Sequence, residues 1–274
     1  AEIDRVGRHR VPADGDPDTG DGDDVLFGEE GSDIIRGQGG SDTIRGGAGG
    51  DIIFGDEGND DLAAGDDADI VFGGAGDDTL DGGAEADILF GDDGLVATLG
   101  DNDDDNGWFP MQSTVDADGY EIGIEDGADG VRGNTASEDE NKDGDLLIGL
   151  GTLPSGLIHD QNERTQDLIL TAGASTDGDD VIIGDDGNDM LLGGRGNDRL
   201  GGDVDPRREA VNPFTPAGED VLIGDGGRVE FDDGFQTLIA SIVGTSGNDV
   251  LYGDNGNDIA LGGGGADVVF GGFG

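Results

Sequence analysis

Aspartate recurs at every ninth position across residues 19–90, and carboxylates at so regular a spacing can bind cations. These aspartates are Asp24, Asp33, Asp42, Asp51, Asp60, Asp69, Asp78 and Asp87. The spacing returns later in the chain at Asp180, Asp189, Asp198, Asp220, Asp249, Asp258 and Asp267. Calcium is a hard cation that takes roughly 6–8 oxygen ligands from carboxylates and backbone carbonyls. We therefore expect these aspartates to be metal ligands.

Each aspartate belongs to a nonapeptide repeat Gly-Gly-x-Gly-x-Asp-x-U-x, where U is a large aliphatic residue, and residues 46–54 are its clearest copy. Glycine in the first six positions permits a positive φ or a close backbone approach. The last three positions suit a short strand, in which position eight points to one side and positions seven and nine to the other. Position eight is therefore the expected inward residue, as at Leu26, Ile35, Ile44, Ile53, Leu62, Val71, Leu80 and Leu89.

This repeat resembles the RTX (repeats-in-toxin) family of hemolysin-type calcium-binding repeats, which form a parallel β-roll. The resemblance implies an all-β fold, a parallel β-roll or β-helix solenoid with inserted loops, which binds several Ca²⁺ ions. It also implies an extracellular protein, secreted or at the cell surface, that a type I system exports. In the family, one turn offers carbonyls at positions two and four with its Asp, and the facing turn offers positions one and three with its own. The glycine carbonyls assigned in this way belong to Gly31, Gly40, Gly47, Gly49, Gly58, Gly76, Gly187, Gly196, Gly256 and Gly265.

Stacking of the repeats explains why such turns can hold calcium. Two turns and two strands make one coil, and successive coils stack at about 4.8 Å. Each repeat then lies over the second repeat before it, so their aspartates converge between two turns. Asp67 and Glu85 replace the glycine at position four of their repeats, where a side chain still permits a carbonyl ligand.

Alternate repeats differ in their outward strand residues. Every second strand is apolar, as in Ile52-Ile53-Phe54, whereas the strands between them are polar, as in Thr43-Ile44-Arg45. One sheet should therefore carry a ladder of Phe54, Phe72 and Phe90 on its outer face. An uncovered patch of this kind usually marks an interface. We expect the ladder to be covered by residues 95–174 or by another chain, including a second copy; rings that merely stiffen the sheet are the alternative.

The repeat register divides the chain into seven segments. We expect a linker or cap at 1–18, a first β-roll block at 19–94, an insertion with degenerate repeats at 95–174 and a second block at 175–202. A Pro-rich insertion at 203–217, a degenerate repeat with a strand insert at 218–243 and a third block at 244–274 complete the chain. The third block ends within a repeat, so we expect a longer protein.

Two details of this division concern the interruptions. Residues 145–148 and 167–170 look like ends of degenerate repeats and suggest that the solenoid continues through the first insertion. Residues 91–98 and 224–231 echo each other, because both follow an aliphatic strand and both leave the register. We interpret them as a recurring exit from the roll, leading into an inserted hairpin.

Charge and composition exclude several classes of function. The chain has 13 Lys and Arg against 65 Asp and Glu, a net charge of −52, which repels nucleic acid and anionic membranes. Cysteine is absent, which excludes a disulfide framework. There is no apolar run of about 18 residues, so we expect no transmembrane helix. The expected partners are calcium ions, without nucleic acid and without direct membrane insertion.

Other candidate sites carry less support. Residues 139–145 match the first half of an EF-hand loop, but Leu150 stands where the bidentate Glu belongs, so a calcium loop and a solvated acidic turn both remain open. Residues 101–107 are a weaker case of the same kind. Trp108 and Phe109 are expected to pin a loop to the solenoid. The histidines, His9 and His159, are far apart, and no hydrolase motif occurs, so we expect no catalytic residues and no enzyme.

The sequence therefore favours an extracellular calcium-binding structural segment of an RTX protein, such as an adhesin, a surface layer or a filament component. It would fold and become rigid when calcium binds. Two alternatives stay open. One is the non-catalytic calcium-binding C-terminal domain of a secreted protease or lipase, and the other is a glycan or protein binding module that uses residues 95–174.

Overall fold

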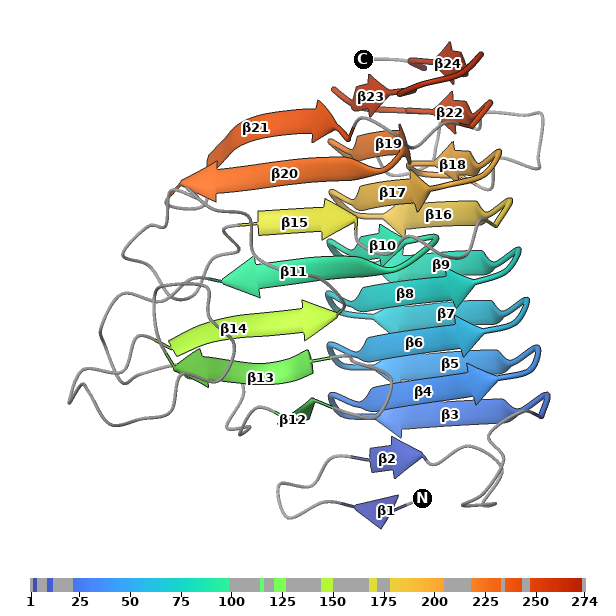
Figure 1. Ribbon diagram of the computed structural model, residues 1–274, viewed down its shortest axis with the longest axis vertical. Coiled ribbons are helices and arrows are strands. Elements are labelled where there is room, and N and C mark those ends of the chain that lie inside the picture. Colours follow the sequence, from blue (N-terminus) through green and yellow to red (C-terminus); the bar gives the residue numbers. More distant parts are fainter. Residues whose placement is uncertain are drawn as a thin grey trace. The chain divides into compact units, whose positions relative to one another are not determined.

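The fold is all-β (Figure 1). It contains two sheets whose strands are mostly parallel and a third sheet of antiparallel strands. The computed structural model describes residues 2–3, 9–11, 22–98, 114–115, 121–126, 144–149, 168–171, 178–204, 218–232, 235–242 and 247–272. The chain separates into two compact units. The first, here called the roll, comprises residues 1–93, 174–226 and 241–274, and the second, here called the inserted sheet, comprises 94–173 and 227–240. Among the described residues, no helix is long and apolar enough to cross a membrane.

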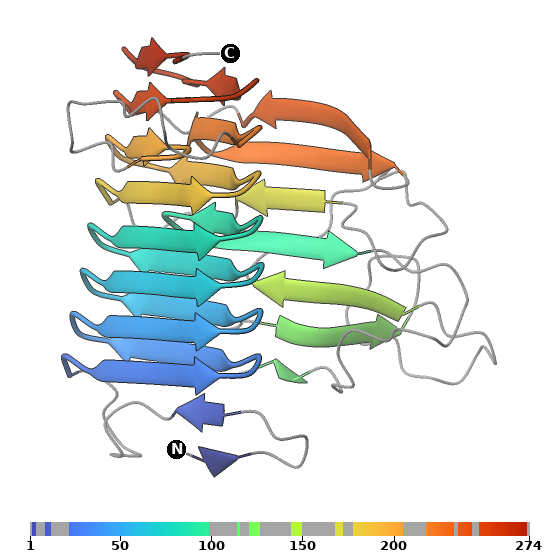
Figure 2. The same ribbon diagram turned by 180° about the vertical axis from the view of Figure 1, so that it is seen from behind.

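Successive repeats of the roll contribute strands to the two sheets in alternation, as the two faces in Figures 1 and 2 show. One sheet has the order β1 (Glu2–Ile3), β2 (His9–Val11), β4 (Ile34–Gly39), β6 (Ile52–Glu57), β8 (Ile70–Ala75), β10 (Ile88–Phe90), β17 (Met190–Gly194), β19 (Val221–Asp225) and β23 (Ile259–Leu261). The other has the order β24 (Val268–Phe270), β22 (Val250–Tyr252), β18 (Arg199–Gly201), β16 (Val181–Asp186), β9 (Thr79–Ala84), β7 (Asp61–Asp66), β5 (Thr43–Ala48) and β3 (Val25–Glu30). The predicted parallel β-roll is confirmed.

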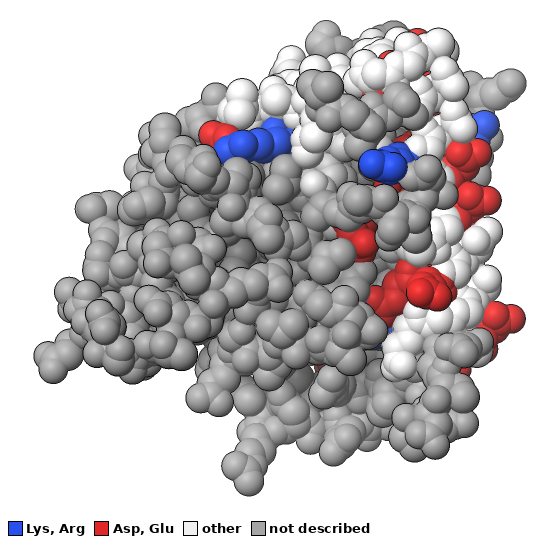
Figure 3. All heavy atoms as spheres, in the orientation of Figure 1, with Lys and Arg blue, Asp and Glu red and all other residues white. Residues whose placement is uncertain are grey.

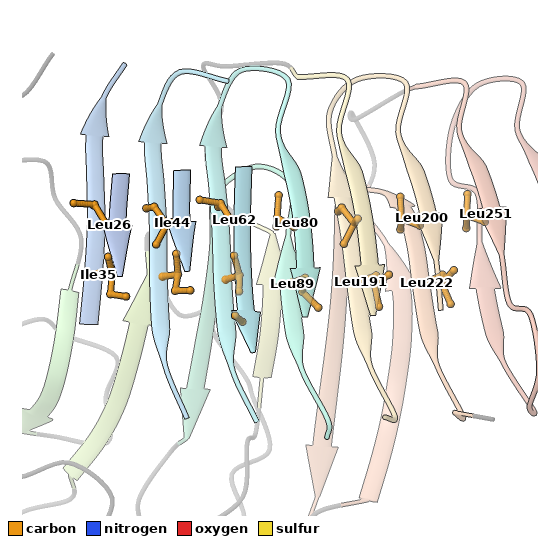
Figure 4. Close-up of a cluster of buried hydrophobic side chains, with 14 residues drawn as sticks. Leu26, Ile35, Ile44, Leu62, Leu80, Leu89, Leu191, Leu200, Leu222 and Leu251 are labelled. Atoms are coloured by element: carbon orange, nitrogen blue, oxygen red, sulfur yellow. The ribbon is translucent and has the colours of Figure 1, made fainter. Parts of the chain in front are cut away.

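Position-eight side chains form the core between the two sheets, as the alternation of side chains along a strand requires (Figure 4). Ile44, Ile53 and Leu62 are each 0% exposed, and the same holds for their counterparts later in the roll, such as Leu191. Ala260, the small residue at this position, is only partly buried against the core. One aliphatic side chain per repeat therefore suffices for a thin core that extends along the roll as far as Leu251, whereas Val269 in the last repeat is 46% exposed.

The outer faces of the two sheets differ as predicted for the first block. Phe54, Phe72 and Phe90 lie on the sheet of β6, β8 and β10, and neighbouring rings stack with centroids 4.9 and 4.8 Å apart. All three rings are at most 1% exposed in the single chain, so a second chain is not needed to bury them. On the other sheet, the outward residues of β5, β7 and β9 are mostly polar, as at Thr43, Arg45 and Asp61, whereas β3 differs because its outward Val25 and Phe27 are apolar and 63% and 56% exposed.

All three interruptions enter the roll at the same point of a repeat, between positions three and four. In an uninterrupted pair, the Asp60 N–H donates to Asp78 Oδ1, 18 residues on. The Asp78 N–H donates to Asp180 Oδ1 across a separation of 102 residues. Equivalent bonds join Asp189 to Asp220 across 31 residues and Asp198 to Asp249 across 51. Split repeats are thus reassembled from 91–93 with 178–183, from 202–204 with 218–223, and from 224–226 with 247–252.

The inserted sheet shows that one expectation was wrong. Residues 145–148 and 167–170 do not continue the solenoid, because β14 (Gly144–Gly149) and β15 (Leu168–Thr171) pair antiparallel with β11 (Gly94–Thr98). The whole order is β12 (Thr114–Val115), β13 (Glu121–Asp126), β14, β11, β15, β20 (Gly227–Asp232) and β21 (Phe235–Ser241). The aliphatic runs that resemble repeat ends are strands of this separate sheet. The predicted hairpin exits correspond to β11 and β20, which directly follow the interrupted turns.

Candidate metal centre

The repeat aspartates line up in two ladders, because each repeat lies over its counterpart one coil earlier. The Asp33 N–H donates to Asp51 Oδ1 at 2.7 Å, and the Asp51 N–H donates to Asp69 Oδ1 at 2.6 Å. The pattern continues in the other turns, for example from Asp42 to Asp60. One oxygen of each of these carboxylates is therefore fixed by the backbone of the preceding coil. The structure thus brings the aspartates of successive coils together.

The second carboxylate oxygen has no such partner within the described part of the chain. Among the described residues, Oδ2 is buried without a hydrogen bond at Asp42, Asp51, Asp60, Asp69, Asp78, Asp87, Asp180, Asp189, Asp198, Asp220, Asp249 and Asp258. A buried carboxylate oxygen without a donor costs free energy unless a cation neutralises it. These repeated oxygens are the clearest indication that the turns bind a cation.

The Oδ2 atoms face the space that position-one glycines leave open. A Cβ added at Gly46 would collide with Asp51 Oδ2 and would lie 2.5 Å from the carbonyl oxygen of Ala64, one coil on. A Cβ at Gly55 would similarly meet Asp60 Oδ2 and the Gly73 carbonyl oxygen. A carboxylate and a carbonyl from adjacent coils therefore converge on one point, and a side chain at position one would fill it.

Carbonyls at positions two and four face the next coil. An added Cβ at Gly65 would meet the Gly47 carbonyl oxygen, which is at position two. At position four, the Gly31, Gly40, Gly58, Gly76, Gly187 and Gly196 carbonyls face the corresponding glycines one coil on in the same way. Gly49, Gly256 and Gly265 share the positive φ of that position, at 110°, 142° and 135°. These carbonyls therefore share an orientation or a backbone conformation along the roll, and their assignment as calcium ligands stays a prediction.

Carbonyls at positions one and three face back toward the preceding coil. The Ala48 carbonyl, at position three, accepts the Gly31 N–H at 2.7 Å, and the Glu57 carbonyl accepts the Gly40 N–H at 2.9 Å. Asp67 and Glu85 adopt the left-handed conformation at position four, with φ of 75° and 74°. The Glu85 carbonyl faces Gly187 and so keeps the orientation of the glycine that it replaces.

Burial gives these carboxyls an unusual affinity for protons. Desolvation, together with neighbouring carboxylates, raises the pKa of Asp51 to about 7 and of Asp78 to about 8, although a backbone N–H bond to each carboxyl acts in the opposite direction. The same causes raise the pKa of Asp180 and of Asp198 to about 9. Without a cation, the ladders therefore hold protons near neutral pH. A calcium ion at the turn would remove this penalty, since it stabilises the charged form.

The donor set fits calcium. Oxygen atoms from carboxylates and carbonyls alone suit a hard cation, and flexible turns suit a high coordination number. In the described part of the chain, no group of three or more His, Cys, Asp or Glu side chains could itself hold a metal ion. A calcium site in the roll would instead combine the aspartates with the backbone carbonyls that lie beside them.

Other acidic residues gather along the turns as well, and the sequence reasoning did not assign them. Asp92, Asp203, Asp225 and Asp254 occupy position two of their repeats and are at most 7% exposed. Each directly follows the glycine that comes after a strand, and this placement is the sequence signal that could have identified them. The signal is not specific, because the exposed Glu29 occupies the same position. In the space-filling view, acidic side chains recur along the edge of the roll while few Lys or Arg side chains appear (Figure 3).

Several sequence-based candidates lie outside the described residues. These are the EF-hand-like segment 139–143 with Leu150, the acidic segment 101–107, the pair Trp108 and Phe109, and His159. The expectations for them remain predictions.

Comparison with known proteins agrees with the geometry. The RTX calcium-binding nonapeptide repeat (four copies) matches residues 18–53, 36–71, 63–95, 175–204 and 243–274. These ranges cover most of the roll, but not residues 1–17 or 205–226, and leave out most of the inserted sheet. No curated protein gives a significant match to the chain.

Proposed function

The chain belongs to the RTX calcium-binding nonapeptide repeat family, and we propose that it is an extracellular structural segment that folds and stiffens on binding calcium. RTX repeats bind Ca²⁺ and are typical of secreted proteins. The observation that carries the proposal is the pair of aspartate ladders. In most of their aspartates one buried carboxylate oxygen has no hydrogen-bond donor among the described residues. Such a segment would serve an adhesin, a surface layer or a filament as a spacer.

Calcium binding is the expected driving force for folding, because the carboxylates of the chain repel one another when the roll forms without a cation. The net charge is −52, and the ladders place carboxylates over one another at every coil. A preformed metal site rarely exists in an unfolded chain, so the binding free energy becomes folding free energy. The proposed role is non-enzymatic, since it needs only this coupling between ion binding and shape. An extracellular location would supply millimolar calcium, which suits weak extracellular modules.

The proposal is tested by circular dichroism and small-angle X-ray scattering with and without millimolar calcium. We expect calcium to convert an expanded chain into a compact β-rich one, with a steep titration because the coils stack cooperatively. Magnesium is the control ion. It demands near-octahedral geometry and holds its waters, so it should substitute poorly. A chain that is fully folded in chelator would contradict the proposal.

A further inference from the structure

Two of the interrupted repeats place an aspartate at position two in an unusual arrangement. Asp92 precedes the insertion of residues 94–177, and Asp225 precedes the insertion of residues 227–246. Both side chains are buried, with exposed fractions of 7% and 1%. The interruption at 205–217 is likewise preceded by Asp203 at position two, which serves below as a comparison.

In uninterrupted repeats, the backbone at position two supplies the oxygen that faces the next coil. Glu29 and Asp56 adopt positive φ values of 79° and 73° there. Their carbonyl oxygens consequently face Gly47 and Gly74 one coil on, where an added Cβ would collide with them. This oxygen is one of the carbonyls that the family ligand set assigns to calcium.

At the interrupted repeats, a carboxylate oxygen occupies this place. Neither Asp92 nor Asp225 has the positive φ found at position two of the uninterrupted repeats, and Asp203 at the third interruption lacks it as well. An added Cβ at Gly194 would meet Asp92 Oδ2, and an added Cβ at Gly263 would meet Asp225 Oδ2. Asp92 Oδ2 also accepts the Arg195 N–H at 2.7 Å. The side chain has therefore taken over the position of the carbonyl where the chain departs into an insertion.

We propose that Asp92 and Asp225 are calcium ligands whose carboxylates replace the position-two carbonyls of the interrupted turns. The other donors of these turns are in place. Asp180 Oδ2 and the Gly193 carbonyl oxygen converge beside Gly91, and the Gly178 carbonyl faces Gly196. The proposal rests on the calcium loading proposed above and deepens it, because it assigns ligands that lie outside the repeat aspartates.

Asp225 and Asp203 differ in how many of their carboxylate oxygens accept hydrogen bonds. Asp225 Oδ2 accepts the Gly264 N–H, and Asp225 Oδ1 is buried without a hydrogen-bond partner among the described residues. Asp203 instead uses both oxygens, which accept the Gly218 N–H and the Asn255 N–H at 2.9 Å each. Asp203 thus holds two backbone segments together with both oxygens, whereas Asp225 Oδ1 accepts no hydrogen bond of ordinary geometry among the described residues. Burial raises the pKa of Asp225, and the backbone N–H groups of Gly264 and Gly247 act against this rise.

The decisive experiment is equilibrium dialysis against calcium chloride, with bound calcium counted by elemental analysis and folding followed by circular dichroism. Asp225→Asn keeps an oxygen for the Gly264 N–H, so it should reach the wild-type spectrum at saturating calcium. We expect it to need roughly tenfold more calcium to load its last ion, which corresponds to about 1.4 kcal/mol. Asp92→Asn is an independent second test with the same expectation.

Two control variants separate the alternatives. Asp77→Asn changes an exposed acid at position five, keeps the oxygen that accepts the Asp179 N–H, and should bind like the wild type. Asp203→Asn should lower stability while keeping the ion count. If Asp225→Asn and Asp92→Asn both titrate like Asp77→Asn, or lose ions no more than Asp203→Asn does, the proposal is overturned. A wild-type chain that binds no calcium would instead refute the proposed function itself.

Discussion

At the scale of single residues, each repeat aspartate divides its two oxygens between two tasks. Oδ1 accepts a backbone N–H of the preceding coil, and Oδ2 is left in a buried space that it shares with a carbonyl. The first task is satisfied by the chain alone and the second is not. The spacing of nine predicts these aspartates as ligands, but it could not reveal this division, since the division depends on which atom faces which coil.

Replacement of Asp51 by Ala should therefore harm calcium-dependent folding far more than replacement of Asp66 by Ala. Asp51 is bonded in the ladder to Asp33 and Asp69, whereas the Asp66 side chain is exposed at position three. We expect Asp51→Ala to shift the midpoint of the calcium titration by about tenfold, a change of about 1.4 kcal/mol. Circular dichroism titrations of both variants give the comparison, and equal midpoints would refute the assignment of the ladder.

The raised pKa values make the stability of the calcium-free roll depend on pH. Burial raises the pKa of Asp69 to about 7 and of Asp87 to about 8, from a usual value of 3.8. The folded state therefore binds more protons than the unfolded chain between these values, so the stability of the calcium-free roll falls as pH rises from about 4 to 8. Calcium must displace these protons, and its apparent affinity should rise over the same range.

Calcium titrations at pH 5.5, 6.5, 7.5 and 8.5 measure this dependence, and calorimetry in two buffers of different ionisation enthalpy counts the protons released. Chelator-treated protein should be more structured at pH 5 than at pH 8. A calcium midpoint that is independent of pH would show that the buried carboxyls are already ionised in the calcium-free state.

At the scale of elements, a repeat can be split within its turn by an insertion and still form, which the sequence did not suggest. The uninterrupted run of residues 19–90 could be predicted in full, because every repeat carries its aspartate and its aliphatic residue in one register. The split repeats could not be predicted from the sequence, because positions one to three and positions four to nine of each lie on opposite sides of an insertion. The hydrogen bond from the Asp189 N–H to Asp220 Oδ1 and the parallel pairing of β17 with β19 together show that residues 202–204 and 218–223 form one repeat.

Deletion of residues 205–217 should consequently leave an intact roll. Joining Val204 to Gly218 creates Gly-Asp-Val-Gly-Glu-Asp-Val-Leu-Ile, which follows the nonapeptide. Gly218 already faces the Gly187 carbonyl, so the turn needs no new geometry. We expect the wild-type calcium midpoint within about twofold, a difference under about 0.5 kcal/mol.

A deletion that is longer by one residue is the matched control. Joining Val204 to Glu219 removes Gly218 and shifts the register by one, which would turn the core residue Leu222 toward the other face. This variant should lose cooperative folding in a calcium titration followed by circular dichroism. Equal behaviour of the two deletions would mean that the interruption does not lie between positions three and four.

At the scale of the whole molecule, the inserted sheet is assembled from two separate insertions. β15 from the first insertion pairs antiparallel with β20 from the second, and Thr171 Oγ1 donates to the Gly227 carbonyl at 3.1 Å. Between these insertions the chain runs through residues 178–226, which belong mostly to the roll. The two insertions start at turns that calcium is expected to order, so folding of the roll should bring their strands together.

Calcium removal should therefore unfold the β15–β20 pairing together with the roll. Hydrogen–deuterium exchange followed by mass spectrometry reports on both units at once, because peptides covering residues 168–171 and 227–232 can be compared with peptides from 43–66 of the roll. With calcium, all should be protected, and in chelator all should exchange at nearly the same rate. The control is chelator with excess magnesium, which should not restore protection of either unit. If residues 168–171 and 227–232 stay protected after the roll has lost its protection from exchange, the inserted sheet folds without calcium. The two units would then not be coupled in folding.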